Sequence, residues 1–394
     1  MKKTIEEIVK LEKIVGGGQA LGELADGRKV FVWGALPGEV ARIQITNSKK
    51  SYAEGIAVEI IESAPNRIEP RDADAYLATS PWQIMDFDSE QNYKSDLIAE
   101  AFQLSDIILP DKVEIAADNN EFYYRNKMEY SLWWDNHTNR ISLAFHKRGT
   151  HQKVAISQSS IERPEIFAEA SRIVAELNQN GGEARRYQSL LVRANQNGEV
   201  SSALFQKNQP HPHMKTLTDS LLGRAYSYSP NGFFQINLPV YEMALTEIAK
   251  HIQSDKVVDM YSGVGTIGLS VASDKQLTLV ETNADAFREL ENNITNDIRP
   301  TVRAVRAKSE EALEYITNDI TLILDPPRAG LDKLVVERLL GTLPPQIIYL
   351  SCNPTTQARD VKPLLGKYKI TKVQGFNFFP RTPHIENLIV LNLY

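Results

Sequence analysis

Short apolar runs in the C-terminal half of the chain, each ending in a turn of small or polar residues, constrain the fold most strongly. They cover residues 257–261, 277–280, 321–324 and 347–350, and helical patterns separate them. Strands that alternate with helices are typical of βαβ units and a parallel sheet. Open α/β sheets bind ligands at the carboxyl ends of such strands. We therefore predict an α/β domain over residues 226–394, with its functional residues at these strand ends.

The first strand end carries a glycine-rich turn, Ser262-Gly-Val-Gly-Thr-Ile-Gly268, that opens a helix. Glu281 ends the second strand, where an acid accepts ribose hydroxyls, and the glycines allow close approach of a nucleotide. The turn departs from the Gly-x-Gly-x-x-Gly pattern, and Asp259 precedes it in the strand, placed to meet a cationic aminoacyl group. The third strand ends in Asp325-Pro-Pro-Arg328, whose prolines make a rigid loop for a flat substrate. Together these features favour S-adenosylmethionine over NAD.

Cys352 is the only cysteine among 394 residues, and it directly follows the fourth strand in the turn Ser351-Cys-Asn-Pro354. A single cysteine excludes a disulfide framework and any zinc or iron–sulfur site built from cysteines. Free cysteine is most often a small buried hydrophobe. The place of Cys352 at a strand end, rather than its residue type, makes it a candidate nucleophile.

Residues 1–65 contain β-like runs at 29–33, 39–45 and 55–61, separated by glycine turns. This pattern predicts a small OB-like β-barrel. Its expected solvent face carries four cations, which are Lys29, Arg42, Lys49 and Lys50.

Residues 66–225 form a predicted central domain of mixed α+β structure, with a helix near residues 90–103. Arg125, Lys127 and Arg148 stand there among aromatic residues. Cations interleaved with rings suit single-stranded RNA, whose bases stack on rings and whose phosphates pair with cations.

The formal net charge of −6 gives no support to non-specific nucleic-acid binding, although a local basic groove is compatible with it. The charged N-terminus lacks the apolar segment of a signal peptide. No apolar run approaches the roughly 18 residues of a membrane span. We expect a soluble cytoplasmic monomer that does not bind membranes.

As an ordered set, the motifs resemble the RNA 5-methyluridine methyltransferases, specifically the bacterial 23S ribosomal-RNA type with an N-terminal TRAM domain. The barrel is followed by Phe233-Phe-Gln-x-Asn237, Tyr261-Ser-Gly-Val-Gly-Thr266, Asp325-Pro-Pro-Arg328, Ser351-Cys-Asn-Pro354 and Pro383-His-Ile-Glu-Asn387. The resemblance implies a class I, Rossmann-like methyltransferase fold and S-adenosyl-L-methionine as the cofactor. It also implies RNA, 23S rRNA in particular, as the substrate.

The resemblance further implies roles for individual residues. Cys352 is the expected nucleophile toward C6 of uracil, and Glu386 the expected general base at C5. The expected cofactor site consists of Gln235, Tyr261, Gly263, Gly265, Thr266, Glu281 and Asp325. The expected substrate contacts are Pro326, Pro327, Arg328 and Asn353, together with Arg125, Lys127 and Arg148. The thiol needs an electropositive neighbour, and either Arg328 or the donors of the 351–353 turn meet that need.

The chain departs from many members of this family at residues 78–83, which read Ala-Thr-Ser-Pro-Trp-Gln. Relatives often bind an iron–sulfur cluster through four cysteines, and Ser80 stands about where one of them is expected. We therefore expect no cluster and no other metal. We also expect Trp82 and apolar neighbours to fill the space.

Several alternatives stay open at this point. In the first alternative, the substrate is tRNA rather than rRNA. In the second, the enzyme methylates C5 of cytosine. Methylation of an exocyclic nitrogen typically uses an aromatic residue where this chain has Arg328, and it leaves Cys352 and Glu386 without a role. A catalytically inactive RNA-binding protein predicts erosion of the cofactor loop or of Cys352, and neither is eroded.

Overall fold

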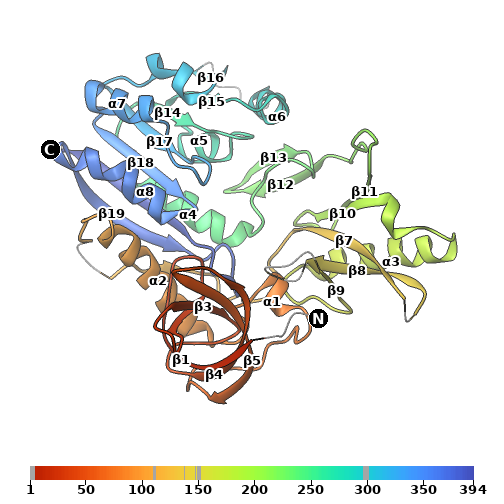
Figure 1. The fold of residues 1–394 in the computed structure, drawn as a ribbon. Coiled ribbons are helices and arrows are strands. Elements are labelled where there is room, and N and C mark those ends of the chain that lie inside the picture. The colour runs from red at the N-terminus through yellow and green to blue at the C-terminus, as the bar shows by residue number, and fades with distance from the viewer. Residues whose placement is uncertain (1–4, 110–111, 137, 147, 149–151, 296–300) are drawn as a thin grey trace.

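A computed structural model describes residues 5–109, 112–136, 138–146, 148, 152–295 and 301–394. The N-terminal part is a closed five-stranded barrel in the order β1-β2-β3-β5-β4 (Figure 1). Its strands are β1 Glu6–Ile14, β2 Ala20–Glu23, β3 Lys29–Trp33, β4 Val40–Ser48 and β5 Tyr52–Glu62. Lys29 and Arg42 form ion pairs with Glu23 and Glu59 across the strands, so the barrel itself neutralises part of its basic face.

A second sheet lies in the central part of the chain, in the antiparallel order β11-β10-β7-β8-β9. Helix α3, Pro164–Gln179, packs on one face through apolar residues such as Ile166 and Ala170. The strands are β7 Lys127–Asp135, β8 Arg140–His146, β9 Lys153–Ala155, β10 Tyr187–Ala194 and β11 Val200–Gln206. A short helix, α1 Tyr76–Thr79, precedes this sheet, and a hairpin of β12 Leu217–Leu221 and β13 Arg224–Tyr228 follows it.

The C-terminal part contains an eight-stranded sheet in the order β16-β15-β14-β17-β18-β20-β19-β6. Strands β14 to β18 run parallel, and β20 lies antiparallel between β18 and β19. Strands β17 and β18 are buried along their whole length, as expected for strands covered on both faces. The bounds are β14 Lys256–Met260, β15 Gln276–Glu281, β16 Val302–Arg306, β17 Ile320–Leu324, β18 Gln346–Ser351, β19 Tyr368–Phe376, β20 Glu386–Leu393 and β6 Ile115–Ala116. The predicted mostly parallel α/β sheet and the N-terminal barrel are confirmed.

Helices cover both faces of this large sheet (Figure 1). One apolar core joins helices α2, α7 and α8 to the sheet and to the barrel. The other core joins α4, α5 and α6 to the opposite face. Their bounds are α2 Phe87–Gln103, α4 Leu238–His251, α5 Thr266–Val271, α6 Ala284–Thr295, α7 Lys333–Thr342 and α8 Pro354–Val361. Short 3-10 helices lie at Ala184–Arg186, Ser309–Glu311, Leu313–Tyr315 and Lys362–Gly366.

Helix α2 and strand β6 come from the predicted central part of the chain, yet they pack on the C-terminal sheet. Residues 115 and 116 pair in parallel with Gly375 and Phe376 at the sheet edge. The predicted boundary at residues 225/226 lies inside β13, whose Tyr226 and Tyr228 belong to the core of α4 to α6. The three-part division of the chain stays a prediction. Among the described residues, no helix has the length and apolar character needed to cross a membrane.

Candidate active site

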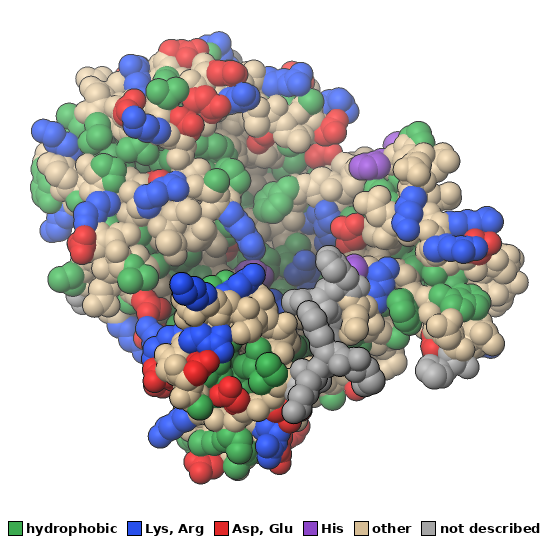
Figure 2. Space-filling model, viewed as in Figure 1, with side chains coloured by type: hydrophobic (Ala, Val, Ile, Leu, Met, Phe, Trp, Pro, Cys, Tyr) green, Lys and Arg blue, Asp and Glu red, His purple; other side chains and the backbone are tan. Residues whose placement is uncertain are grey.

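A large cleft opens at the carboxyl ends of the parallel strands, with a volume of about 1500 Å³. Figure 2 shows the molecule hollowed between the C-terminal part and the rest of the chain. The cleft is larger than a typical pocket for one small molecule, which is roughly 300–1,000 Å³. Many of the residues singled out from the sequence line it, namely Gln235, Tyr261, Gly263, Thr266, Glu281, Asp325, Pro326, Pro327, Arg328, Cys352 and Glu386.

One end of the cleft is formed by the glycine-rich turn after β14. Tyr261, Gly263 and Gly265 all have positive φ angles, of 69°, 56° and 90°, which turn the chain sharply into α5. A Cβ atom at Gly263 would have no heavy atom within 4 Å, so its backbone faces open space. A Cβ at Gly265 would lie 2.6 Å from Leu290, so this glycine allows close packing rather than lining the cleft.

Glu281 faces the same turn from the end of β15. Its carboxylate accepts hydrogen bonds from the backbone amides of Gly263, at 2.8 Å, and Asn283, at 2.6 Å. A carboxylate offers about four lone-pair sites, so acceptor capacity remains for ribose hydroxyls. The Tyr261 hydroxyl donates to Ser309 at 2.9 Å. An acid, open glycine backbone and a ring at one end of a large cleft fit the nucleoside of S-adenosyl-L-methionine.

Asp259 lies beneath the turn and does not reach the cleft. Its Oδ2 accepts from the Gly268 amide at 2.8 Å, and its Oδ1 has no hydrogen-bond partner among the described residues. Burial is the main cause that raises the pKa of Asp259, to about 8. The sequence-based expectation of a direct contact with the cofactor is therefore replaced by a supporting role under α5.

Gln235 also lines the cleft, in a loop that the central sheet holds. The backbone carbonyl of Gln235 accepts hydrogen bonds from the side-chain amide of Asn126, at 3.0 Å, and from Arg193, at 3.1 Å. Arg193 is buried, and it also donates to the Phe234 carbonyl at 2.7 Å. Sequence reasoning missed Asn126 and Arg193, because no local pattern signals a contact across about 40 to 110 positions of sequence.

The candidate nucleophile is held by a turn that is anchored on both sides. Cys352 is a free, partly buried thiol. The Asn353 amide donates to Ser351 Oγ at 3.1 Å, and Asn353 Oδ1 caps helix α8. Asn353 Nδ2 donates to the Arg328 carbonyl at 3.0 Å, which ties this turn to the loop after β17. Asn353, expected to bind substrate, thus positions the two loops and does not line the cleft.

Sheet register brings Glu386 close to this thiol. Ser351 at the end of β18 pairs with Asn387 in antiparallel β20, and Cys352 and Glu386 are the chain neighbours of that last pair. Glu386 is buried, and burial together with Asp325 raises its pKa well above the usual range. Burial also raises the pKa of Asp325, to about 7.

The positive charge of Arg328 opposes the increase in pKa at Cys352 and at Glu386. Burial, with Glu386 second, raises the pKa of the Cys352 thiol to about 11, while Arg328 lowers it. Arg328 also lowers the pKa of Glu386. Of the two sources of activation considered from the sequence, the guanidinium of Arg328 is the one that acts on both groups.

His384 completes this side of the cleft. Arg328 Nη2 lies 3.4 Å from His384 Nδ1, and the ring packs edge-on against Phe379, with centroids 5.6 Å apart. Burial, followed by Arg328 and further cations, lowers the pKa of His384 to about 4. The imidazole is therefore neutral at pH 7, and Nδ1 accepts from Arg328. Phe379 and His384 both line the cleft.

The three cations expected to contact RNA do not line the cleft. Lys127 Nζ donates to the Gly232 carbonyl at 3.0 Å, and burial lowers its pKa to about 8. Arg125 donates to the Lys127 carbonyl at 2.9 Å. As ligands of RNA these residues stay a prediction, since the structure gives each an internal partner.

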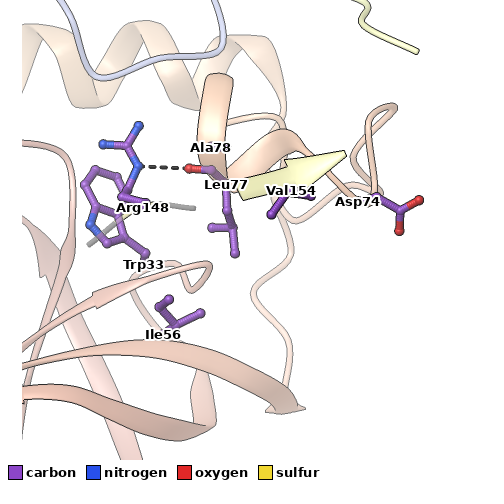
Figure 3. Close-up of a pocket in the computed structure, with 7 residues that line it drawn as sticks. All are labelled: Trp33, Ile56, Asp74, Leu77, Ala78, Arg148 and Val154. Carbon is purple, nitrogen blue, oxygen red and sulfur yellow. Dashed lines mark hydrogen bonds between the residues drawn. The ribbon is translucent and has the colours of Figure 1, made fainter. Parts of the chain in front are cut away.

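Arg148 stacks over the Trp33 ring of the barrel, 4.3 Å from its centroid, and donates to the Leu77 carbonyl at 2.9 Å. Figure 3 shows this contact beside a small cavity between barrel and central sheet, into which Leu77 and Ile56 also project. Arg148 therefore joins two parts of the molecule.

The stretch expected to replace an iron–sulfur site is tightly packed. Trp82 is buried, and its Nε1 donates to the Gly18 carbonyl of the barrel at 2.9 Å. Gln83 Nε2 donates to Ser80 Oγ at 2.7 Å and to Asp72 at 2.9 Å. Trp82 is therefore buried against the barrel, and that it fills the space of a cluster stays a prediction.

Comparisons with known proteins agree with this arrangement. The family model described as tRNA (Uracil-5-)-methyltransferase matches residues 216–393, and the TRAM domain model matches residues 6–58. An uncharacterized RNA methyltransferase of Treponema denticola is 30% identical over 406 residues, covering 97% of this chain and 98% of that protein. Another from Thermosynechococcus vestitus is 26% identical, with 98% of each chain covered.

Among solved structures, the Pyrococcus abyssi tRNA (uracil-54, C5)-methyltransferase in complex with S-adenosyl-L-homocysteine is similar in fold. It superposes with a TM-score of 0.77 at 21% identity, covering 97% of this chain and 100% of that one. The chain therefore belongs to the RNA methyltransferases, and its residues 216–393 match the tRNA (Uracil-5-)-methyltransferase family model.

Proposed function

We propose that the chain methylates C5 of a uridine in RNA through a covalent bond between Cys352 and C6 of the base. The observation that carries the proposal is that Cys352 and Glu386, the chain neighbours of the last residue pair of β18 and β20, both line the cleft. Uracil C5 is a poor nucleophile, and addition of a thiolate to C6 converts C5 into an enolate carbon. Covalent catalysis thus splits one difficult step into easier ones.

Each group of the chain has a defined task in this scheme. The Cys352 thiolate forms the S–C6 bond, and the electrons of the C5–C6 double bond move toward C5 and O4. S-adenosyl-L-methionine, when bound, supplies the methyl group that C5 receives. The Glu386 carboxylate then takes the proton from C5, the C5–C6 double bond forms again, and the thiolate leaves as the S–C6 bond breaks.

The cofactor would be held by the glycine-rich end of the cleft. Glu281 and the open backbone at Gly263 suit its ribose, and Tyr261 provides an apolar wall. Pro326 and Pro327 stiffen the loop on which the uracil ring would lie. A base in a helix must be extruded to reach this depth, at a cost of roughly a few kcal/mol.

The substrate we propose is 23S rRNA, on the strength of the N-terminal barrel and its match to the TRAM model. The Pyrococcus abyssi enzyme, which by its title acts on tRNA, also covers nearly the whole of this chain. Transfer RNA is therefore the competing substrate. Mapping 5-methyluridine in both RNA classes from a deletion strain and a complemented strain separates the two.

Trapping with RNA that contains 5-fluorouridine tests the chemistry itself. The wild-type chain with S-adenosyl-L-methionine is expected to form an adduct that survives denaturing electrophoresis, because fluorine at C5 cannot be removed as a proton. Cys352→Ala should form none. Equal adduct formation by that variant would remove Cys352 from the reaction.

A further inference from the structure

The loop 377–385 joins β19 to β20 and leads directly into Glu386. It also carries Phe379 and His384, which line the cleft. A buried loop must satisfy its backbone donors and acceptors without a sheet partner. Glu386 pairs with Phe376 at the end of β19, and the partners of this loop determine where the residues just before Glu386 lie.

Those partners come from one distant stretch of the chain, residues 82–124. Four hydrogen bonds, each of 3.0 or 3.1 Å, hold the loop backbone: Lys94 Nζ to Phe379 O, Tyr124 Oη to Pro380 O, Arg381 N to Glu90 Oε2 and Trp82 N to Arg381 O. The loop is thus bound from behind by α2 and the residues that flank it.

Two side chains of α2 form the centre of this contact. Glu90 and Lys94 are both fully buried and lie 3.0 Å apart. Asn377 links them, since its Oδ1 accepts from Lys94 at 2.5 Å and its Nδ2 donates to Glu90 at 2.8 Å. Replacing a buried ion pair by apolar residues often leaves stability unchanged. A gain in stability therefore does not account for the Glu90–Lys94 ion pair. Its hydrogen bonds to the loop 377–385 do.

We propose that Glu90 and Lys94 are positioning residues that fix the loop 377–385, so that Glu386 stands ready to take the proton from C5. The inference rests on the function proposed above. Cys352 is anchored independently, through Asn353 and the Arg328 carbonyl. The pair therefore acts on the proton-removal step and leaves thiol addition nearly unchanged.

Two measurements on one variant separate these steps. The double variant Glu90→Gln/Lys94→Met removes both charges together and leaves no unpaired buried ion. Adduct formation with 5-fluorouridine RNA reports thiol addition and methylation, which need no base. Multiple turnover on unmodified RNA also requires Glu386. We expect turnover to fall at least tenfold while the trapping rate changes less than threefold and the KM for RNA less than threefold.

A matched control is Lys333→Met on α7, which breaks an exposed ion pair with Glu337 of the same i,i+4 spacing. This control variant should keep the wild-type rates of trapping and of turnover. If the double variant does not fold, Asn377→Ser removes the loop side of the contact and should give the same split between the rates.

Equal slowing of trapping and turnover, or wild-type turnover, would overturn the positioning role. A merely structural role lowers both rates in proportion to the folded fraction. Failure of the wild-type chain to form any adduct would instead contradict the proposed function, so the two failures are distinguishable.

Discussion

Two sets of charged side chains meet at the loop 377–385 and differ in how they are paired. Glu90 and Lys94 of α2 and Arg381 of the loop are engaged by one another and by backbone groups. In the cleft, burial raises the pKa of Asp325 and Glu386, and Arg328 is the cation that opposes this effect on Glu386. Paired charges hold a shape, whereas charges left under-compensated in a cleft mark groups available for chemistry.

The largest effect in this comparison is expected at the thiol. Cys352→Ser replaces the nucleophile by a hydroxyl that does not ionise near neutral pH, and turnover should fall by roughly 10⁴-fold or more. Steady-state methylation of RNA measures it, and unchanged cofactor binding by calorimetry serves as the control. A variant within tenfold of wild type would show that Cys352 is not the nucleophile.

The second-largest effect is expected at Glu386, the proposed general base. Glu386→Gln keeps the shape of the side chain and removes its ability to take a proton. Turnover should fall by roughly 10²–10⁴-fold, while the variant still binds RNA. Quench-flow measurement of product release checks this, and normal turnover would remove Glu386 from the mechanism.

The pH profile of kcat/KM sharpens the role of Arg328. The thiol, with its pKa raised to about 11, and Glu386 must both be deprotonated to act. Activity should therefore rise with pH from 6 to 9. Arg328→Met removes the cation that lowers both pKa values, so the rise should move to higher pH. If the thiol pKa alone increases by about one, activity at pH 7.5 should be roughly tenfold lower. A profile unmoved by the substitution would contradict the role of Arg328.

The pH dependence of thermal stability tests the raised pKa of Asp325. Its folded-state pKa of about 7 lies above the ordinary value of 3.8, so the folded chain holds the proton more tightly than the unfolded chain. This contribution is complete below about pH 4 and is lost as pH rises through about 7. Between pH 5 and 8, the Tm of wild type should therefore fall by a few degrees more than that of Asp325→Asn. Parallel curves would show that the pKa of Asp325 is not raised in the folded chain.

The smallest effect is expected at Arg148. Its contact with Trp33 should contribute about 0.5–2 kcal/mol to the docking of the barrel. A double-mutant cycle of Arg148→Met and Trp33→Leu, followed by thermal unfolding, measures the coupling. Weaker RNA binding with no coupling to Trp33 would restore the sequence-based view of Arg148 as an RNA contact.

The sequence was sufficient to predict the parallel sheet, because its strands are short apolar runs that end in recognisable turns. It also indicated many of the residues that line the cleft, since the carboxyl ends of parallel strands meet at one edge. The contacts between α2 and the loop 377–385 could not be predicted from the sequence. Lys94 and Asn377 lie 283 positions apart, and no local pattern pairs them. The internal partners of Arg148 and Asn353 were likewise not predicted, because their hydrogen bonds join separate parts of the chain.

The mass of the covalent intermediate tests the central claim most directly. Glu386→Gln is incubated with unmodified RNA and S-adenosyl-L-methionine, then digested, and the peptides are weighed. The peptide containing Cys352 is expected to carry a uridine nucleotide plus one methyl group, and the same peptide of wild type to carry far less under the same conditions. Rapid product release with no modified peptide, or a nucleotide attached elsewhere, would contradict covalent catalysis by Cys352.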